Sequence, residues 1–216
     1  MSTPTAELLR SPRLPLYVAE LKRALAAEKV RRQRFYRETP EDQKAEFING
    51  AVIVNPPARL EHISSETFLV ALLGAHVHSK DLGCLGHEKM MVSLARNDYE
   101  PDICFFTKSK ARHFKPSQTR FPAPDFIVEI LSPSTAQTDR GVKFEDYAAH
   151  GVGEYWLVDP TKRTVEQYLL ERGEYHLAFE GKSGTLRSRA IKGFAIPVAA
   201  LFERRAYAEA LRKLLR

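Results

Sequence analysis

The stretch that runs from residue 124 to 158 places the tightest constraint on the fold. Residues 124–131 (PDFIVEIL) form an apolar run that a proline precedes and the Ser-Pro-Ser-Thr segment ends, as is typical of a buried strand. A helical pattern follows at about 138–150 and closes at Gly151, and residues 154–158 (EYWLV) predict the next strand. A strand, a helix and a strand in this order predict a crossover unit and at least a mixed β-sheet.

The rest of the chain adds elements before and after this unit. Residues 1–13 lack periodicity and are expected to form a loose arm, whereas apolar residues recur at helical spacing from Leu14 onward. The pair Asn49-Gly50 between two apolar runs predicts a hairpin with a type I′ turn. Further elements are expected at 61–79 (helix), 84–95 and 99–107 (strands), 164–170, 175–180 and 191–196 (meandering strands), and from Leu201 on (a short basic helix).

Composition excludes several classes of protein. Of the 216 residues 44% are hydrophobic and no apolar run approaches the ~18 to 20 residues of a membrane span, so we expect no membrane segment. No secretory signal is visible, and two cysteines, Cys84 and Cys104, do not make a disulfide framework, which favours a reducing, cytoplasmic setting with both as buried strand residues. The net charge of +6 suits contact with a phosphate backbone, but it also suits an ordinary basic protein.

Basic residues gather in two places. Four arginines crowd the end of the first long helix, where they either complement the helix dipole or contact phosphates. Residues 108–123 form a basic loop in which Phe114 and Phe121 are interleaved, so the loop either holds a nucleic-acid strand or is a solvated loop anchored by its two phenylalanines. The candidate nucleic-acid contacts in this loop are Lys108, Lys110, Arg112, Lys115 and Arg120.

Two carboxylates interrupt apolar strands. Asp102 and Glu129 lie in runs where an acidic side chain is costly unless a partner neutralises it, and a divalent metal is one natural partner. Alternation along the strand puts Phe126 and Val128 on one face and Glu129 on the other. If the two strands are neighbours, both carboxylates converge on one ion, for which the carbonyl of Ile130 is a further oxygen ligand. Mg²⁺ is the expected ion, with Mn²⁺ as its substitute.

A lysine on the next helix is the candidate cation for phosphodiester hydrolysis. Lys143 follows the Glu129 strand, and Tyr147 lies one turn further on the same face. Asp139 precedes Lys143 by one turn, so a plain Asp139–Lys143 surface pair is the alternative interpretation. The presence of both carboxylates favours the catalytic one.

These motifs resemble the PD-(D/E)XK nuclease superfamily, which has the restriction-endonuclease-like fold, and within it the Uma-type endonucleases, formerly a family of unknown function. The matching segments are Glu46-Phe-Ile-Asn-Gly, His62, Tyr99-Glu-Pro-Asp-Ile, 124–135, Asp139-Arg-Gly-Val-Lys143, Tyr147 and 151–159. The resemblance covers about residues 44–200 and is specific in 99–160. It implies an α/β fold with a restriction-endonuclease-like core, in which helices flank a central mixed β-sheet. We therefore expect an N-terminal arm and basic helix at 1–43, a nuclease domain with a β-rich C-terminal extension at 44–200, and a short basic helix at 201–216.

The resemblance also implies residue roles. Asp102 and Glu129 are expected to bind metal, with Glu46 as an additional acidic residue of the site. The superfamily's lysine normally follows the second carboxylate by two residues, a position held here by Leu131. In this branch the lysine is expected on the following helix, at Lys143, and Lys89 on the strand before Asp102 is the fallback. Candidates for the surrounding shell are His62, Lys89, Glu100, Asp139 and Tyr147, although for Glu100 an exposed turn carboxylate is the favoured interpretation.

The sequence thus predicts a metal-dependent endonuclease that hydrolyses phosphodiester bonds of nucleic acid, with DNA as the expected substrate. A homodimer is expected because cutting both strands requires two sites. The alternative is a non-catalytic protein on the same fold that binds nucleic acid or a partner. A third hypothesis is a hydrolase for another phosphate-containing substrate.

Overall fold

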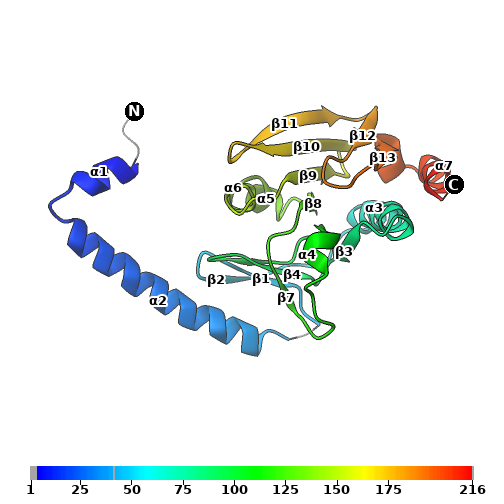
Figure 1. The fold of residues 1–216 in the computed structure, drawn as a ribbon. Coiled ribbons are helices and arrows are strands. Elements are labelled where there is room, and N and C mark those ends of the chain that lie inside the picture. Colours follow the sequence, from blue (N-terminus) through cyan, green and yellow to red (C-terminus); the bar gives the residue numbers. More distant parts are fainter. Residues whose placement is uncertain (1–3, 41, 216) are drawn as a thin grey trace. The chain divides into compact units, whose positions relative to one another are not determined.

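The computed structural model describes residues 4–40 and 42–215, and its elements are drawn in Figure 1. The chain forms two compact units, Met1–Asn55 and Pro56–Arg216. The domain bounds predicted from the sequence remain predictions. The first three residues of the predicted arm and the last residue of the predicted C-terminal helix lie outside the described residues.

The first unit contains two helices and a hairpin, namely α1 (Pro4–Arg10), α2 (Leu14–Glu38), β1 (Ala45–Ile48) and β2 (Ala51–Val54). The long helix was expected, but the loose arm was wrong for the residues of α1. Ala6, Glu7 and Leu8 are strong helix formers, and their propensity outweighs the absence of an apolar period over so short a segment.

The predicted hairpin is confirmed. Asn49 and Gly50 both have positive φ, at 50° and 84°, as a type I′ turn requires, and β1 and β2 pair antiparallel around them. The hairpin packs on α2, where the rings of Phe35 and Phe47 lie 5.7 Å apart. Nε of Arg31 donates a 3.0 Å hydrogen bond to the carbonyl of Gly50. The second half of α2 therefore covers its own hairpin.

The second unit is built on a six-stranded sheet in the order β11-β10-β9-β8-β6-β3, in which β8 and β9 are parallel and the other neighbours antiparallel. This arrangement confirms the predicted crossover and mixed sheet. Strand β4 pairs antiparallel with β5 and parallel with β7.

The elements are α3 (Leu60–Ser79), β3 (Gly83–His87), β4 (Met91–Ser93), β5 (Asp98–Tyr99), β6 (Ile103–Thr107), α4 (Lys108–Ala111), β7 (Arg120–Phe121), β8 (Phe126–Ile130), α5 (Ala136–Arg140), α6 (Val142–Ala149), β9 (Glu154–Asp159), β10 (Thr164–Glu171), β11 (Glu174–Gly181), β12 (Thr185–Arg187), β13 (Ala195–Pro197), η1 (Val198–Leu201) and α7 (Arg204–Leu214).

Helices cover both faces of the six-stranded sheet, with α5 and α6 on one side and α3 and α7 on the other (Figure 1). On the α3 side, Phe126, Val128 and Ile130 of β8 are fully buried in one core cluster with Trp156. The opposite face of β8 carries Glu129, as the alternation along this strand predicts. The sheet thus separates an apolar core from a face that contains buried charge.

Two local expectations were wrong. The single helix predicted at 138–150 is divided into α5 and α6 at Gly141, where an added Cβ would lie 2.9 Å from the carbonyl oxygen of Gln137. Only glycine therefore permits this close approach. Lys89 was expected on a strand, but it is exposed in the turn between β3 and β4. Within the described residues, no helix is both long enough and apolar enough to cross a membrane.

Candidate active site around Glu129 and Lys143

The pairing of β6 with β8 brings the two predicted carboxylates together. The strands are antiparallel, with Ile103 opposite Val128, so the next residues along the register, Asp102 and Glu129, also face each other. The backbone N–H of Asp102 lies 3.4 Å from Oε2 of Glu129, and the N–H of Ile130 donates a 2.8 Å hydrogen bond to Oδ2 of Asp102. Asp102 is 5% exposed and Glu129 3% exposed. The sheet therefore fixes this buried pair through backbone contacts.

Lys143 reaches this pair from α6. Its Nζ donates a 3.0 Å hydrogen bond to Oε1 of Glu129 and lies 3.1 Å from Oδ1 of Asp139. The lysine is 4% exposed and its Nζ stands 5.9 Å from the ring centre of Tyr99. A plain Asp139–Lys143 surface pair does not describe this geometry, because the lysine is buried and shared between two carboxylates.

Tyr147, one helical turn after Lys143, contacts the same carboxylate oxygen. Its hydroxyl donates a 2.9 Å hydrogen bond to Oε1 of Glu129. Its ring packs edge-on against Tyr99, with centroids 5.2 Å apart. Two donors on one oxygen and the backbone N–H beside the other fix the orientation of the Glu129 side chain.

Asp139 supports the lysine from the end of α5. Burial raises the pKa of the Asp139 carboxyl above its usual value, while the Lys143 ammonium and a hydrogen bond with Thr135 act in the opposite direction. The hydroxyl of Tyr155 donates a 3.1 Å hydrogen bond to the backbone carbonyl of Asp139. The segment that carries Asp139 is thereby attached to the sheet.

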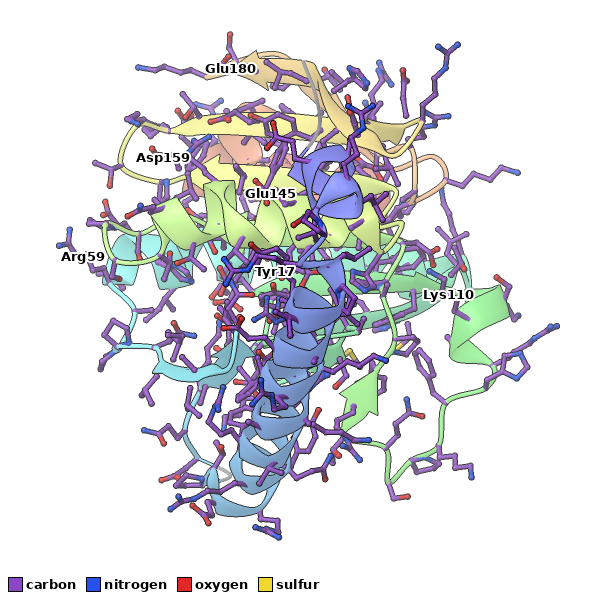
Figure 2. All side chains as sticks on the ribbon, turned by 90° about the vertical axis from the view of Figure 1, so that its left-hand side faces the viewer. Tyr17, Arg59, Lys110, Glu145, Asp159 and Glu180 are labelled. Atoms are coloured by element: carbon purple, nitrogen blue, oxygen red, sulfur yellow. The ribbon has the colours of Figure 1, made fainter. Side chains whose placement is uncertain are left out.

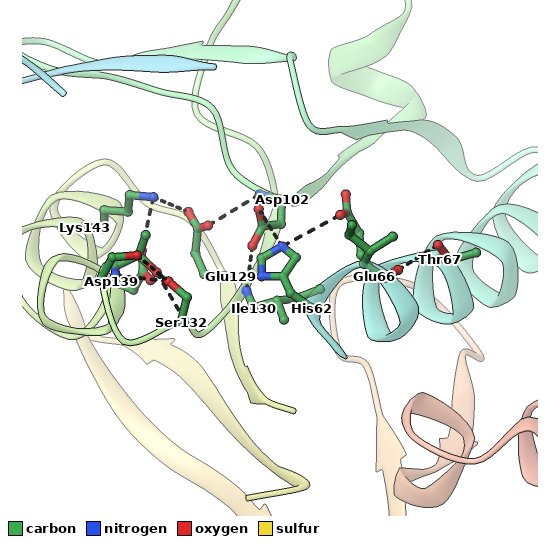
Figure 3. A network of polar contacts seen from close by, with 12 residues as sticks. His62, Glu66, Thr67, Asp102, Glu129, Ile130, Ser132, Asp139 and Lys143 are labelled. Atoms are coloured by element: carbon green, nitrogen blue, oxygen red, sulfur yellow. Dashed lines mark hydrogen bonds and ion pairs between the residues drawn. The ribbon is translucent and has the colours of Figure 1, made fainter. Parts of the chain in front are cut away.

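A histidine extends the polar network on the other side of Asp102. Nε2 of His62, in the first turn of α3, lies 3.6 Å from Oδ1 of Asp102 and 3.8 Å from Oε2 of Glu66. Figure 3 shows Lys143, Glu129, Asp102, His62 and Glu66 in a continuous line of contacts. Glu66 was not predicted from the sequence. Its i, i+4 spacing from His62 on one helix is the signal that indicates a shared face.

The charge balance of this cluster fits a cation. Among the residues described, Lys143 is the buried lysine of the network, against four buried carboxylates that belong to Glu66, Asp102, Glu129 and Asp139. Carboxylate oxygens are the ligands that Mg²⁺ and Mn²⁺ prefer. Within the described part of the chain, no group of three or more His, Cys, Asp or Glu side chains forms a ready metal cage. A magnesium site needs only one or two carboxylates, because water and substrate oxygens complete the shell.

Three other residues were predicted at the site, namely two acidic side chains and one lysine. Glu46 is on β1 in the first unit, and its participation stays a prediction. Glu100 is 6% exposed, so the expectation of an exposed turn carboxylate was wrong. Lys89 is exposed in its turn, and its role as a fallback lysine is not needed where Lys143 already contacts Glu129.

The basic loop is organised by its aromatic residues. Phe106, Phe114 and Phe121 form a cluster with ring centroids 5.0 to 6.0 Å apart, so the two loop phenylalanines anchor the loop on Phe106. Lys110 is held by the carbonyl of Ala123 and by an ion pair with Asp125 at 2.9 Å, and Lys108 pairs with Asp81. Figure 2 shows Lys110 on the opposite side of the second unit from Arg59, which precedes α3. The exposed basic residues of the loop are Lys108, Arg112, Lys115 and Arg120.

Comparison with known proteins adds a family and a fold. A family model described as Uma2, "Putative restriction endonuclease", matches residues 32–199. No curated protein matches the chain. A solved structure described as a "putative nuclease belonging to DUF820" from Anabaena variabilis is similar with a TM-score of 0.67 and 20% identity, over 82% of this chain and 96% of that chain. At this identity the likeness establishes the fold, a mixed α/β sheet flanked by helices.

Proposed function

Since the chain belongs to the Uma2 family of putative restriction endonucleases, we propose that it is an endonuclease that hydrolyses phosphodiester bonds of DNA with a divalent cation, Mg²⁺ or Mn²⁺. The contact between Lys143 and Glu129, beside Asp102, is the observation that carries this proposal. A buried lysine shared among carboxylates is costly to fold. Such buried charges are typical of functional sites, and a site for a phosphate and a metal would account for them here.

Asp102 and Glu129 are the proposed metal ligands, with the carbonyl of Ile130 as a further oxygen and Glu46 as a supporting acidic residue. Their carboxylates face each other across the β6–β8 pair, which suits two ligands of one ion. A divalent cation held by these residues would polarise the scissile phosphate and activate a water molecule for attack. The hydrogen bonds to both carboxylates fix the direction of the oxygen lone pairs that would hold the ion.

Lys143 is proposed to stabilise charge at the scissile phosphate or to orient the attacking water. An ammonium has three donors, and Lys143 directs two of them to Glu129 and Asp139. The side chain can therefore exchange its contact with one carboxylate for a substrate oxygen and keep the other. Tyr147 has its own hydrogen bond to Glu129, so the carboxylate stays oriented if the lysine turns toward the substrate.

The proposed substrate contacts lie outside this cluster. The exposed basic residues of the 108–123 loop are candidates for phosphate contact, and the net charge of +6 favours approach to a polyanion. We further propose a cytoplasmic homodimer, because cleavage of both strands of a duplex requires two sites.

Nicking of a supercoiled plasmid with Mg²⁺ or Mn²⁺ tests the proposal. We expect wild-type protein to convert supercoiled plasmid to the open-circular form. Asp102→Asn and Glu129→Gln, which keep the shape and one acceptor oxygen of each side chain, should lower the rate at least about 100-fold. Asp125→Asn is the matched control, because Asp125 is a carboxylate directly before the start of β8 that pairs with Lys110.

The same assay separates the alternatives. Single-stranded DNA, RNA and mononucleotides should be cleaved more slowly than duplex DNA. Wild-type protein that binds duplex DNA but neither binds metal nor nicks it would support the non-catalytic alternative and contradict the proposal. Faster cleavage of mononucleotides than of any polymer would instead support a different phosphate-containing substrate.

A further inference from the structure

Exposed apolar side chains are concentrated in the first unit. Among the described residues, thirteen large hydrophobic side chains are exposed, and nine of them belong to this unit, which is about a quarter of the chain. Monomeric proteins expose single apolar residues commonly, whereas a contiguous apolar patch marks an interaction surface. The nine residues are Leu9, Leu16, Val18, Leu21, Leu25, Val30, Val52, Ile53 and Val54.

One face of α2 carries a regular apolar stripe, formed by Leu14, Val18, Leu21 and Leu25. Their spacing of four, three and four residues places them on a single helix face. Val18 is 37% exposed, and Leu21 and Leu25 are each 54% exposed. The stripe is therefore an apolar surface with room for a partner.

The same face is covered further along the helix. Seven and fourteen residues after Leu21, at Glu28 and Phe35, the side chains are buried, and Phe35 packs on Phe47 of the hairpin. The hairpin tip at Gly50 reaches α2 at Arg31. The stripe lies on the turns before this contact, so within the first unit the hairpin covers only the second half of the face.

A helix half without a packing partner is marginally stable. Isolated helices shorter than about 12 to 15 residues are weakly populated in water, and most helix stability comes from packing of an apolar face. The stripe occupies such a length at the start of α2. A partner that covers it would stabilise this half of the helix.

We propose that the partner is a second copy of this chain, and that two α2 helices pair antiparallel through their stripes. The spacing is the same when read in either direction, so a two-fold axis between residues 19 and 20 sets Leu14 opposite Leu25 of the partner subunit. The same axis sets Val18 opposite Leu21 of the partner subunit. A self-complementary patch of this kind is what a two-fold symmetric interface requires.

Charge does not oppose this pairing. Between residues 14 and 25 the charged side chains are Glu20, Lys22 and Arg23, which carry both signs and lie off the stripe. The stripe spans about 16 Å of helix, which is short for a standard interface, so we expect a micromolar dissociation constant. The family model begins at residue 32, so the stripe lies outside it and this inference does not rest on the proposed nuclease activity.

Sedimentation equilibrium of the full chain at micromolar concentration tests the interface. The wild-type mass should approach twice 24.5 kDa at the higher concentrations. Leu21→Glu should weaken the dimer at least about 100-fold, because it places two charges in an apolar contact. Leu16→Glu is the matched control on another face of the same helix, and it should change the dissociation constant less than about twofold. A wild-type monomer throughout this range, or equal effects of the two variants, would overturn the proposal.

Disulfide trapping tests the antiparallel register. Residues 14 of two antiparallel copies would lie about 16 Å apart along the axis, whereas residue 14 lies level with residue 25 of the other copy. In a Cys84→Ser background, a mixture of Leu14→Cys and Leu25→Cys proteins should form the mixed disulfide dimer. Neither variant alone should crosslink, because a disulfide requires Cα atoms less than about 7 Å apart. Crosslinking of each variant with itself would indicate parallel helices and contradict the proposed arrangement.

Discussion

Nζ of Lys143 lies 3.0 Å from Oε1 of Glu129, although the two residues are fourteen apart in sequence and belong to a helix and a strand. The strand β8 and the helix α6 belong to one crossover unit, with α5 between them, and their side chains meet on the sheet face that α6 covers. In this chain the lysine thus reaches the carboxylate from the helix, while Leu131 occupies the strand position two residues after Glu129.

Lys143→Met tests the role of this contact. Removing the ammonium should lower the nicking rate by about 100- to 1,000-fold, because one charged donor to the reacting phosphate is lost. Loss of one partner of a buried ion pair should also lower the free energy of unfolding by about 3 to 5 kcal/mol. Urea denaturation and plasmid nicking measure the two effects. A variant that nicks at the wild-type rate would show that Lys143 has only a structural role.

Tyr147→Phe removes one hydrogen bond to Glu129 and keeps the ring against Tyr99. We expect the free energy of unfolding to fall by about 1 kcal/mol and the nicking rate by about tenfold, because Glu129 loses part of its fixed orientation. Tyr168→Phe is the control, since the Tyr168 hydroxyl donates to Glu166 and not to Glu129. Equal loss of activity in both variants would indicate a general effect on stability.

The Arg140–Glu166 pair predicts a dependence of stability on pH. The Arg140 guanidinium donates two hydrogen bonds to Glu166, at 2.7 and 2.5 Å, and holds the pKa of that carboxyl below its usual value of 4.5. A carboxyl with a lowered pKa in the folded state stabilises the protein above its unfolded pKa, and this contribution is lost as the pH falls through the folded pKa.

Glu166→Gln should therefore lower the free energy of unfolding by about 1 kcal/mol or less at neutral pH, since the pair is partly solvated. The difference from wild type should shrink as the pH falls below about 4. Thermal denaturation between about pH 3 and 7 would measure it, with Glu203→Gln, from the exposed Arg163–Glu203 pair, as control. A difference that grows toward acid pH would contradict this assignment.

The exposed basic residues of the 108–123 loop predict a salt-dependent contact with DNA. The triple variant Arg112→Ala, Lys115→Ala and Arg120→Ala should weaken DNA binding and reduce the slope of log K against log salt by about one unit per lost phosphate contact. Arg172→Ala with Lys182→Ala, at the β10–β11 turn and just after the end of β11, is the control for loss of positive charge elsewhere. An unchanged salt slope in the triple variant would exclude the loop from the DNA contact.

Most of the fold follows from periodicity and turn chemistry. The strand 124–131, the hairpin at Asn49-Gly50 and the long helices have patterns that tertiary contacts reinforce, so the sequence predicted them correctly. The family predicted from the residue motifs is likewise confirmed by the family model. The division of α5 from α6 was missed, because it depends on the close approach of Gly141 to Gln137 and not on hydrophobic pattern.

The positions of the site residues could be predicted where their spacing along one strand or one helix determines which face they occupy. Alternation along β8 separated Glu129 from the apolar core, and the helical period placed Tyr147 one turn from Lys143. The burial of Glu100 and the contact of His62 with Asp102 could not be read from spacing, since both depend on which segments pack together. The packing of Phe114 on Phe106 likewise depends on tertiary contacts and could not be read from spacing.

Calorimetric titration of Mn²⁺ into the metal-free protein addresses the proposed metal site without any substrate. We predict that wild-type protein binds the ion and that Asp102→Asn abolishes this binding, while Asp125→Asn binds like wild type. The amide oxygen that Asp102→Asn introduces can still accept the hydrogen bond from the Ile130 N–H, so loss of binding would reflect the lost charge and not a lost fold. Wild-type protein that binds no metal, or an Asp102→Asn variant that binds it equally well, would contradict the proposed metal site.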